Sequence, residues 1–200
     1  MTDKTTRYTV IGAGHGGKAM AADLAARGFP VTLYNRSAER ILEIVARGEI
    51  DLEYESGNSR CCRLERITSD IAEALDGVDV VMVVVPASGH RDVARACAPC
   101  LRDGQVVILN PGRTGGALEF RQVLKRENCQ AQVIVAETGT FIFASRSTGP
   151  AQARIFRRKN AVPLAALPAA HTGAALEAVC DAYPQFIPAP DVLHTSLDNM

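Results

Sequence analysis

The chain has 200 residues, of which 47% are hydrophobic, and its 22 basic and 22 acidic residues balance to a formal net charge of zero. A chain of this size builds a normal buried core and has room for one domain and a small part of another. The balanced charge gives no global attraction to nucleic acid or to an anionic membrane. Because the N-terminus lacks an apolar signal core and no apolar stretch reaches the roughly 18 residues of a membrane span, we expect a soluble cytoplasmic protein.

A short apolar strand over residues 8–11 leads into a glycine-rich turn, which opens into an alanine-rich helix over residues 18–27. A second strand over residues 30–34 completes a unit of the length that a dinucleotide site needs. A glycine turn that binds nothing is the alternative interpretation, and the strand and helix on either side favour the dinucleotide.

The turn itself reads Gly12-Ala13-Gly14-His15-Gly16-Gly17 and fits the pattern G-x-G-x-x-G. Gly12 permits the tight turn, Gly14 lets the backbone approach a pyrophosphate, and Gly17 lets the helix pack closely on the sheet. The helix begins near His15 and points its free N–H groups and positive dipole end at the phosphates. We therefore predict that Gly12, Gly14, His15, Gly16 and Gly17 bind the coenzyme.

The end of the second strand selects the dinucleotide. NAD sites usually carry an acidic residue there, which accepts hydrogen bonds from the ribose 2′-OH. This chain has Asn35, Arg36 and Ser37 instead. Arg36 suits a 2′-phosphate in fork geometry, and Ser37 can donate a hydrogen bond to it or cap the helix that follows. The three residues favour NADP over NAD, with NAD kept as the alternative.

Strands and helices alternate through the next hundred residues. An irregular hairpin over residues 50–67 precedes a short helix with Ser69 or Asp70 as its cap. A valine-rich run over residues 78–85 indicates a strand that is buried on both faces, and Pro86 ends it. The remaining elements are a helix at 90–98, a strand at 106–109, a helix at 117–125 and a strand at 133–136. This alternation predicts an α/β fold, a doubly wound Rossmann-type domain with a mostly parallel sheet.

The pattern changes after Thr138. We expect antiparallel strands at 141–147 and 153–158, another strand at 162–167 and a helix at 172–179. Residues 183–191 carry three prolines and resemble a linker. The prediction is a dinucleotide-binding domain over residues 1–182, followed at 183–200 by a linker and the start of a helical C-terminal domain that is otherwise absent.

Six cysteines in a chain without a signal sequence are expected to be reduced thiols. Cys97 and Cys100 form a C-x-x-C pair, but it follows a helix instead of opening one, which is the wrong end for lowering a thiol pKa. Cys61 and Cys62 are adjacent, which disfavours tetrahedral zinc binding by both. We expect no metal site.

Several blocks of the chain resemble the octopine/nopaline (opine) dehydrogenase family, which is related to 6-phosphogluconate dehydrogenase. The resemblance covers the chain but only about the N-terminal half of a family member. Its marks are Gly12 to Gly17, Val85-Pro86-Ala87-Ser88-Gly89-His90, Leu109-Asn110-Pro111-Gly112-Arg113-Thr114-Gly115-Gly116, Glu137-Thr138, and Thr195-Ser196-Leu197-Asp198-Asn199.

The resemblance implies an NAD(P)-dependent oxidoreductase that condenses an α-keto acid with an amino acid and reduces the imine. It further implies that Val85, Pro86, Ala87 and Asn110 line the coenzyme at the ends of two strands. Glu137 and Thr138 then face the substrate. In the plain structural interpretation, Pro86 ends a strand and Glu137 caps or pairs.

The family's catalytic histidine and aspartate lie in the helical domain, so we expect them beyond Met200 and assign no catalytic residue here. None of His15, His90, His171 and His194 matches that histidine, and a neutral His90 is expected to cap backbone groups. Two alternatives stay open. The first is a non-catalytic NADP-binding module. The second is an enzyme of the ketopantoate reductase or glycerol-3-phosphate dehydrogenase type, although Lys18, Lys125 and Lys159 are not placed at strand ends as its catalytic lysine should be.

The substrates implied are small molecules, an α-keto acid and an amino acid. The missing domain is expected to cover the rim around Pro86 and Asn110 and the apolar segment Phe141-Ile142-Phe143. Without it, this apolar surface is exposed and predicts a homo-oligomer.

Overall fold

The computed structural model describes residues 5–197. Eight strands form sheet A in the order β12-β11-β8-β7-β6-β1-β2-β5, and four form sheet B in the order β4-β3-β10-β9. The elements are β1 (Tyr8–Ile11), α1 (His15–Ala26), β2 (Val31–Tyr34), η1 (Ala38–Ile41), α2 (Leu42–Arg47), β3 (Glu49–Tyr54), β4 (Ser59–Arg63), β5 (Arg66–Thr68), α3 (Ile71–Leu75), β6 (Val80–Val83), η2 (Ala87–Gly89), α4 (His90–Cys97), β7 (Val106–Leu109), α5 (Gly116–Arg126), β8 (Ile134–Thr138), β9 (Phe143–Gly149), β10 (Gln152–Arg158), β11 (Val162–Leu167), η3 (Ala169–His171), α6 (Thr172–Glu177), β12 (Phe186–Pro188) and α7 (Val192–Leu197).

The central strands of sheet A are parallel, as expected from their unbroken apolar runs. β1 pairs with β2 and with β6, β6 pairs with β7, and β7 pairs with β8, each in parallel register. Every residue of β1, β6 and β7 is buried, because helices or other layers cover both faces. At one edge, β11 pairs antiparallel with β8, and β12 runs in the same direction as β11. The Rossmann-type prediction is confirmed.

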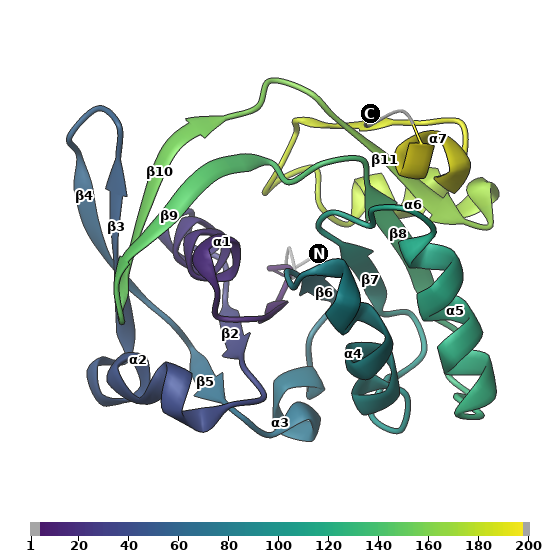
Figure 1. The fold of residues 1–200 in the computed structure, drawn as a ribbon, viewed down its shortest axis with the longest axis horizontal. Coiled ribbons are helices and arrows are strands. Elements are labelled where there is room, and N and C mark those ends of the chain that lie inside the picture. Colours follow the sequence, from purple (N-terminus) through teal and green to yellow (C-terminus); the bar gives the residue numbers. More distant parts are fainter. Residues whose placement is uncertain (1–4, 198–200) are drawn as a thin grey trace.

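Two apolar cores lie on the two faces of sheet A. One core packs α3, α4 and α5 on the strands through residues such as Leu75, Cys97 and Phe120. The other contains α1, α6 and the inner face of sheet B, with Met20, Leu52 and Tyr183 among its members. Figure 1 shows α4 and α5 beside each other, away from α1.

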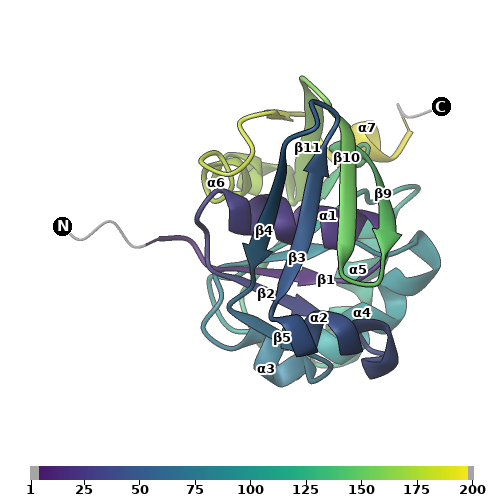
Figure 2. The same cartoon turned by 90° about the vertical axis from the view of Figure 1, so that its left-hand side faces the viewer.

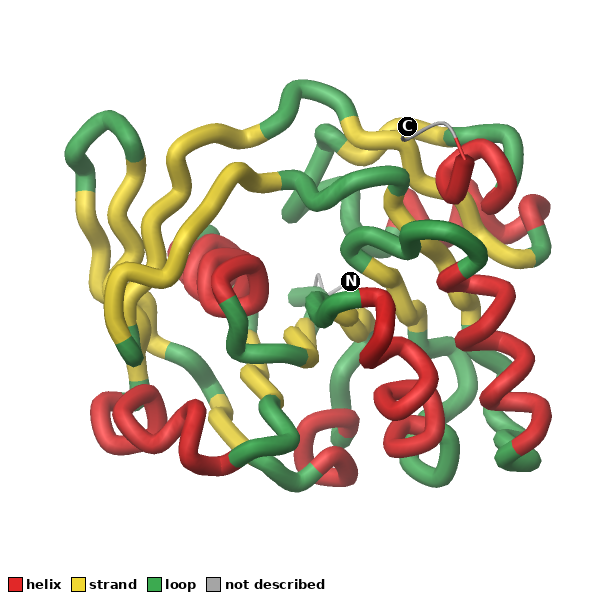
Figure 3. Tube along the Cα trace, viewed as in Figure 1, coloured by secondary structure: helices red, strands yellow, loops and turns green. Residues whose placement is uncertain are grey.

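Helix α1 lies between the two sheets. Residues 17 to 24 of this helix are all buried, because sheet A covers one side and sheet B covers the other. Figure 2 shows the four strands of sheet B in front of α1, and in Figure 3 these strands arch over the helix. Sheet B combines the predicted hairpin β3–β4 with the later hairpin β9–β10 through a parallel pairing of β3 with β10.

The polar residues of α1 are satisfied from sheet B. Asp23 is fully buried and accepts hydrogen bonds from Arg27 Nε at 2.9 Å and from Tyr54 Oη at 3.1 Å. Arg158 of β10 also donates to this carboxylate. Burial raises the pKa of Asp23, and the adjacent guanidinium of Arg27 opposes that rise. The carboxylate thus joins α1 to both hairpins.

The segment from residue 183 differs from the expected linker. Phe186–Pro188 forms β12, which pairs in parallel with β11 at the edge of sheet A. An edge strand tolerates the prolines that suggested a linker, because its outer N–H groups need no partner. Helix α7 contacts β8, β11 and α5. The domain boundary at 182/183 stays a prediction, although the described residues on both sides of it share one sheet.

None of the helices within residues 5–197 is both long enough and apolar enough to cross a membrane.

Candidate functional site

The carboxyl ends of four parallel strands place most of the predicted site residues along one edge of sheet A. Ile11, Val83, Leu109 and Glu137 lie at matched register positions of β1, β6, β7 and β8. The segments that follow them therefore share this edge. Open α/β sheets bind ligands outside the carboxyl ends of their strands, at the point where the strand order reverses. In sheet A this point lies between β1 and β6.

The glycine-rich turn after β1 has the geometry that its pattern predicts. Gly12 has a φ of +112°, which a side chain would strain, and a Cβ at Gly17 would overlap the carbonyl oxygen of Gly12. Gly14 is different, because no atom lies within 4 Å of the place where its Cβ would be. Gly12 and Gly17 thus serve the fold, whereas Gly14 borders open space at the N-terminus of α1.

Asn35 braces this turn. Its Oδ1 accepts a hydrogen bond from Ala13 N at 3.1 Å, and its Nδ2 donates to Ser37 O at 2.9 Å. The amide therefore joins the end of β2 to the glycine-rich turn, a role that the sequence did not reveal. The side chain of Ser37 makes no capping bond to the following turn η1.

Arg36 is the exposed cation at the end of β2. Its side chain is 77% exposed, and its one ion pair among the described residues is a 3.4 Å contact with Asp92, which is itself 58% exposed. An exposed pair of this kind contributes little, so the guanidinium is available to a ligand.

Three residues of the β9–β10 turn region form hydrogen bonds with side chains of α1. Ser147 N donates to Nδ1 of His15 at 2.8 Å. Lys18 Nζ donates to the carbonyl oxygens of Gly149 and Pro150 at 2.8 and 2.9 Å, and burial lowers the pKa of Lys18. The sequence could not indicate these contacts, because about 130 residues separate the partners.

The ends of β6 and β7 form the neighbouring part of the edge. Pro86 and Ala87 are exposed, and Val85 is half-buried behind them. Asn110 is 2% exposed; its Nδ2 donates to Ile108 O at 2.8 Å, while its buried Oδ1 has no partner among the described residues. A buried amide oxygen without a donor fits a ligand that supplies an N–H group.

Glu137 lies fully buried at the end of β8. Its Oε2 accepts from Ala117 N at 2.7 Å, and its Oε1 accepts from the hydroxyls of Thr195 at 2.8 Å and Ser196 at 2.7 Å. Burial raises the pKa of Glu137, and these three donors oppose that rise. The carboxylate caps the start of α5 and binds α7, which agrees with the expectation that Glu137 caps or pairs.

Thr138 is also fully buried and donates to Leu109 O at 3.3 Å. The role of Glu137 and Thr138 toward a substrate stays a prediction. Of the family-like terminal block, Thr195 to Leu197 form the end of α7, while Asp198 and Asn199 lie outside the described residues.

The four histidines lie in different environments. His90 is 1% exposed; burial lowers its pKa below the ordinary 6.5, and its Nε2 has no partner within residues 5–197. No hydrogen bond of its ring to a backbone group is found there, so the expected capping role has no support. His171 is exposed, and His194 contacts Asp191 at 2.9 Å on the surface of α7.

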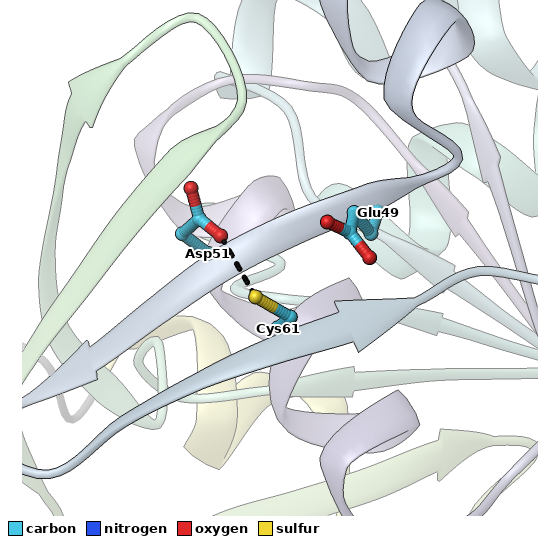
Figure 4. A group of neighbouring side chains, drawn as sticks. All are labelled: Glu49, Asp51 and Cys61. Atoms are coloured by element: carbon cyan, nitrogen blue, oxygen red, sulfur yellow. Dashed lines mark hydrogen bonds between the residues drawn. The ribbon is translucent and has the colours of Figure 1, made fainter.

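The cysteines show no reactive arrangement. Burial raises the pKa of the Cys97 thiol to about 12, which disfavours a thiolate. Glu49, Asp51 and Cys61 lie together on β3 and β4 (Figure 4). Arg47 pairs with both carboxylates, and the Cys61 thiol donates to Asp51, which raises its pKa. These groups satisfy one another without an ion.

The apolar segment Phe141-Ile142-Phe143 does not form the exposed surface that was expected. Ile142 is fully buried, Phe143 at the start of β9 is 5% exposed, and Phe141 is half-buried, because all three pack into the core that contains α1. The expected homo-oligomer stays a prediction, for which this segment gives little support.

Comparison with known proteins identifies related chains. Residues 7–139 match the family model described as the NAD-dependent glycerol-3-phosphate dehydrogenase N-terminus. An opine dehydrogenase of Arthrobacter sp. (strain 1C) is 44% identical over 193 residues, which are 96% of this chain and 53% of that protein.

Two solved structures are similar in fold. Octopine dehydrogenase with NADH and L-arginine matches with a TM-score of 0.85 at 22% identity, over 98% of this chain and 51% of that one. Yersinopine dehydrogenase with NADP+ bound matches with a TM-score of 0.73 at 17% identity, over 94% of this chain and 48% of that one. At these identities the structures show the fold alone. The chain spans about half the length of these relatives.

Proposed function

The chain belongs to the family described as the NAD-dependent glycerol-3-phosphate dehydrogenase N-terminus, and we propose that it is the coenzyme-binding part of an oxidoreductase, of the opine dehydrogenase type. The single observation that carries the proposal is the open space at Gly14, at the N-terminus of α1, within a turn whose other glycines are closed by packing. The 44% identity to an opine dehydrogenase supports the reaction type. The whole enzyme reductively condenses an α-keto acid with an amino acid.

Different residues along the sheet edge bind different parts of the coenzyme. Gly12, Gly14, Gly16 and Gly17 shape the turn, and the free N–H groups at the start of α1 bind the pyrophosphate. His15 borders the same space, with Nδ1 already occupied by Ser147 N. Pro86, Ala87 and the unpartnered Oδ1 of Asn110 receive the nicotinamide end, and Val85 packs behind them. When bound, the coenzyme supplies the hydride for imine reduction.

The ribose end selects NADP over NAD. β2 ends without a carboxylate to bind a 2′-OH, and the guanidinium of Arg36 extends into solvent at that point. A guanidinium binds a phosphate group through paired N–H donors. Asn35 holds the turn and Ser37 lies beside Arg36. The solved relatives carry NADH in one case and NADP+ in the other, so NAD stays the alternative.

The test is a titration of both coenzymes with the unmodified chain and with Arg36→Ala. A charge-assisted hydrogen bond contributes about 1.5–3 kcal/mol, so the variant should bind NADPH roughly 10- to 150-fold more weakly. Its affinity for NADH should stay within about twofold. Arg63→Ala, which removes an exposed arginine from β4, is the matched control and should change neither affinity. An equal loss for both coenzymes contradicts the assignment of Arg36.

One observation supports a second candidate, a reductase that uses a lysine as acid. Lys159 donates from Nζ to Thr140 Oγ1 at 2.7 Å, two residues beyond the end of β8. It is therefore closer to the sheet edge than its place in the sequence suggested. Lys18 is held by the β9–β10 turn, and Lys125 lies near the far end of α5. Oxidation of NADPH with a keto acid alone, lost in Lys159→Met, would favour this candidate over the opine reaction.

A further inference from the structure

A cleft of about 600 Å³ lies far from the coenzyme edge, between the end of α5 and the start of β8. Three basic side chains line it: Arg121 and Lys125 from α5, and His171 from the turn η3 that follows β11. No carboxylate is among its lining residues. Its volume falls within the range of about 300–1,000 Å³ that is usual for small-molecule sites.

The cleft also has an apolar wall. Leu124 and Val133 are buried and Ile134 is half-buried where they line it. An apolar wall beneath a few basic groups is the usual composition of a site for an organic anion.

The acidic groups nearby are already engaged. Glu119 of α5 pairs with Arg91 of α4, and Glu127, which directly follows α5, pairs with Arg95 of α4. Both carboxylates lie on the opposite side of the helix from the cleft residues. Asp103 accepts a hydrogen bond from Gln132 N at 2.7 Å and does not line the cleft. Within the described part of the chain, no ion pair is formed by Arg121, Lys125 or His171.

Arg121 is oriented for binding. It donates from one guanidinium nitrogen to Val133 O at 3.3 Å, which holds the group against the start of β8. A guanidinium has five N–H donors, so most of them stay available. The helix dipole accounts for basic residues in the last turn of α5, such as Lys125 and Arg126. It does not account for His171, which comes from a separate segment.

We propose that this cleft is a second binding site, specific for a small organic carboxylate with an apolar body. The carboxylate lies against Arg121, Lys125 and His171, and the body packs on Leu124 and Val133. Because α5 has 11 residues and begins at the coenzyme edge, its end lies roughly 16 Å away from that edge. Ligand at this site therefore binds without competing with the coenzyme.

The experiment titrates the chain with four probes while backbone amide signals are followed by NMR. Benzoate carries both features, benzyl alcohol only the body, and acetate and inorganic phosphate only the charge. We expect benzoate to bind at least about tenfold more tightly than each of the others, with shifts confined to residues 121–134 and 169–173. Phosphate binding as tightly as benzoate would overturn the proposed ligand class.

Variants test the residues. The double variant Arg121→Gln/Lys125→Gln should weaken benzoate binding at least tenfold, and His171→Asn at least threefold. Arg126→Gln, an exposed arginine of the same helix turn outside the cleft, is the matched control and should bind benzoate normally. Because His171 lies on another element, losses at both places exclude a distortion of α5. An unchanged affinity in these variants would overturn the proposal.

The last experiment repeats the benzoate titration in the presence of saturating NADPH. The proposal requires that benzoate still bind with the same affinity and the same shifts. Displacement of benzoate by NADPH would mean that it binds at the coenzyme edge, which would overturn the second site while leaving the proposed function intact.

Discussion

Replacing Gly14 by valine should abolish coenzyme binding and leave the fold intact. Gly14 has φ of −76° and ψ of −168°, a conformation open to any residue, and its Cβ position has no neighbour within 4 Å. The valine side chain would fill the space assigned to the pyrophosphate. The turn cannot move aside, because the adjacent glycines are packed against Val84, Val85 and the turn itself. We expect NADPH affinity to fall by about 100-fold or more, equivalent to about 2.7 kcal/mol.

The stability change should be small. Valine is a poorer N-cap than glycine by up to about 1 kcal/mol, which corresponds to a fall in Tm of about 2–4 °C for a domain of this size. Calorimetric titration with NADPH measures the affinity, and differential scanning calorimetry measures Tm. Gly173→Val is the matched control, because Gly173 also has no neighbour within 4 Å and lies in α6. It should keep full affinity.

Two outcomes would refute this reasoning. Wild-type affinity for NADPH in Gly14→Val would show that the pyrophosphate does not lie at this turn. A chain unfolded by the same substitution would show that the space is not open. Gly17→Ala should behave differently from both, because its Cβ overlaps the carbonyl oxygen of Gly12, and it should fail to fold.

The remaining predictions concern stability and activity. Burial places the pKa of His90 below 6.5, the ordinary value of the unfolded chain. As the pH falls, the imidazole is therefore protonated in the unfolded chain before it is protonated in the folded one, and stability is lost below pH 6.5. Urea titrations at several pH values below 6.5 measure this loss. The unfolding free energy of His90→Gln should depend less steeply on pH than that of the unmodified chain, by at most about 1.4 kcal/mol per pH unit, and an unchanged slope contradicts the buried neutral ring. Asp70 accepts from Ala72 N and Glu73 N at the start of α3, so Asp70→Ala should lower the unfolding free energy by about 0.5–2 kcal/mol; no loss would mean that the cap is dispensable. The 200-residue chain should bind NADPH yet oxidise none with pyruvate and a panel of amino acids, and turnover would place a proton donor within these residues, with His90 the first to test. Sedimentation tests the proposed homo-oligomer, which a monomer across the micromolar range would exclude.

Local patterns predicted most of sheet A and its helices. The valine-rich run of β6 and the glycine-rich turn are signals contained in a few neighbouring residues, and Asp70 was one of two expected caps. β12 was missed, because its prolines suggest a linker unless the strand is known to lie at an edge.

The rest depends on contacts between distant segments. Sheet B needs β3 to pair with β10, about a hundred residues later, and periodicity within either strand gives no sign of its partner. The same holds for Lys18 and His15, which bind a turn that the sequence places elsewhere. Glu137 was predicted at the sheet edge, but its complete burial depends on α7 folding back over it. Asn35 was expected to face the ribose, and its contact with Ala13 follows only from the closeness of β1 and β2.

We propose above that the edge of sheet A at β1, β2, β6 and β7 holds one NADP(H) molecule. Calorimetric titration of the unmodified chain with NADPH, repeated with NADH, tests it most directly. We expect one NADPH to bind per chain, and the affinity for NADPH to be higher than that for NADH. An NADH preference would contradict the assignment of the 2′-phosphate to Arg36, and the absence of binding for both coenzymes would show that this edge is not a coenzyme site.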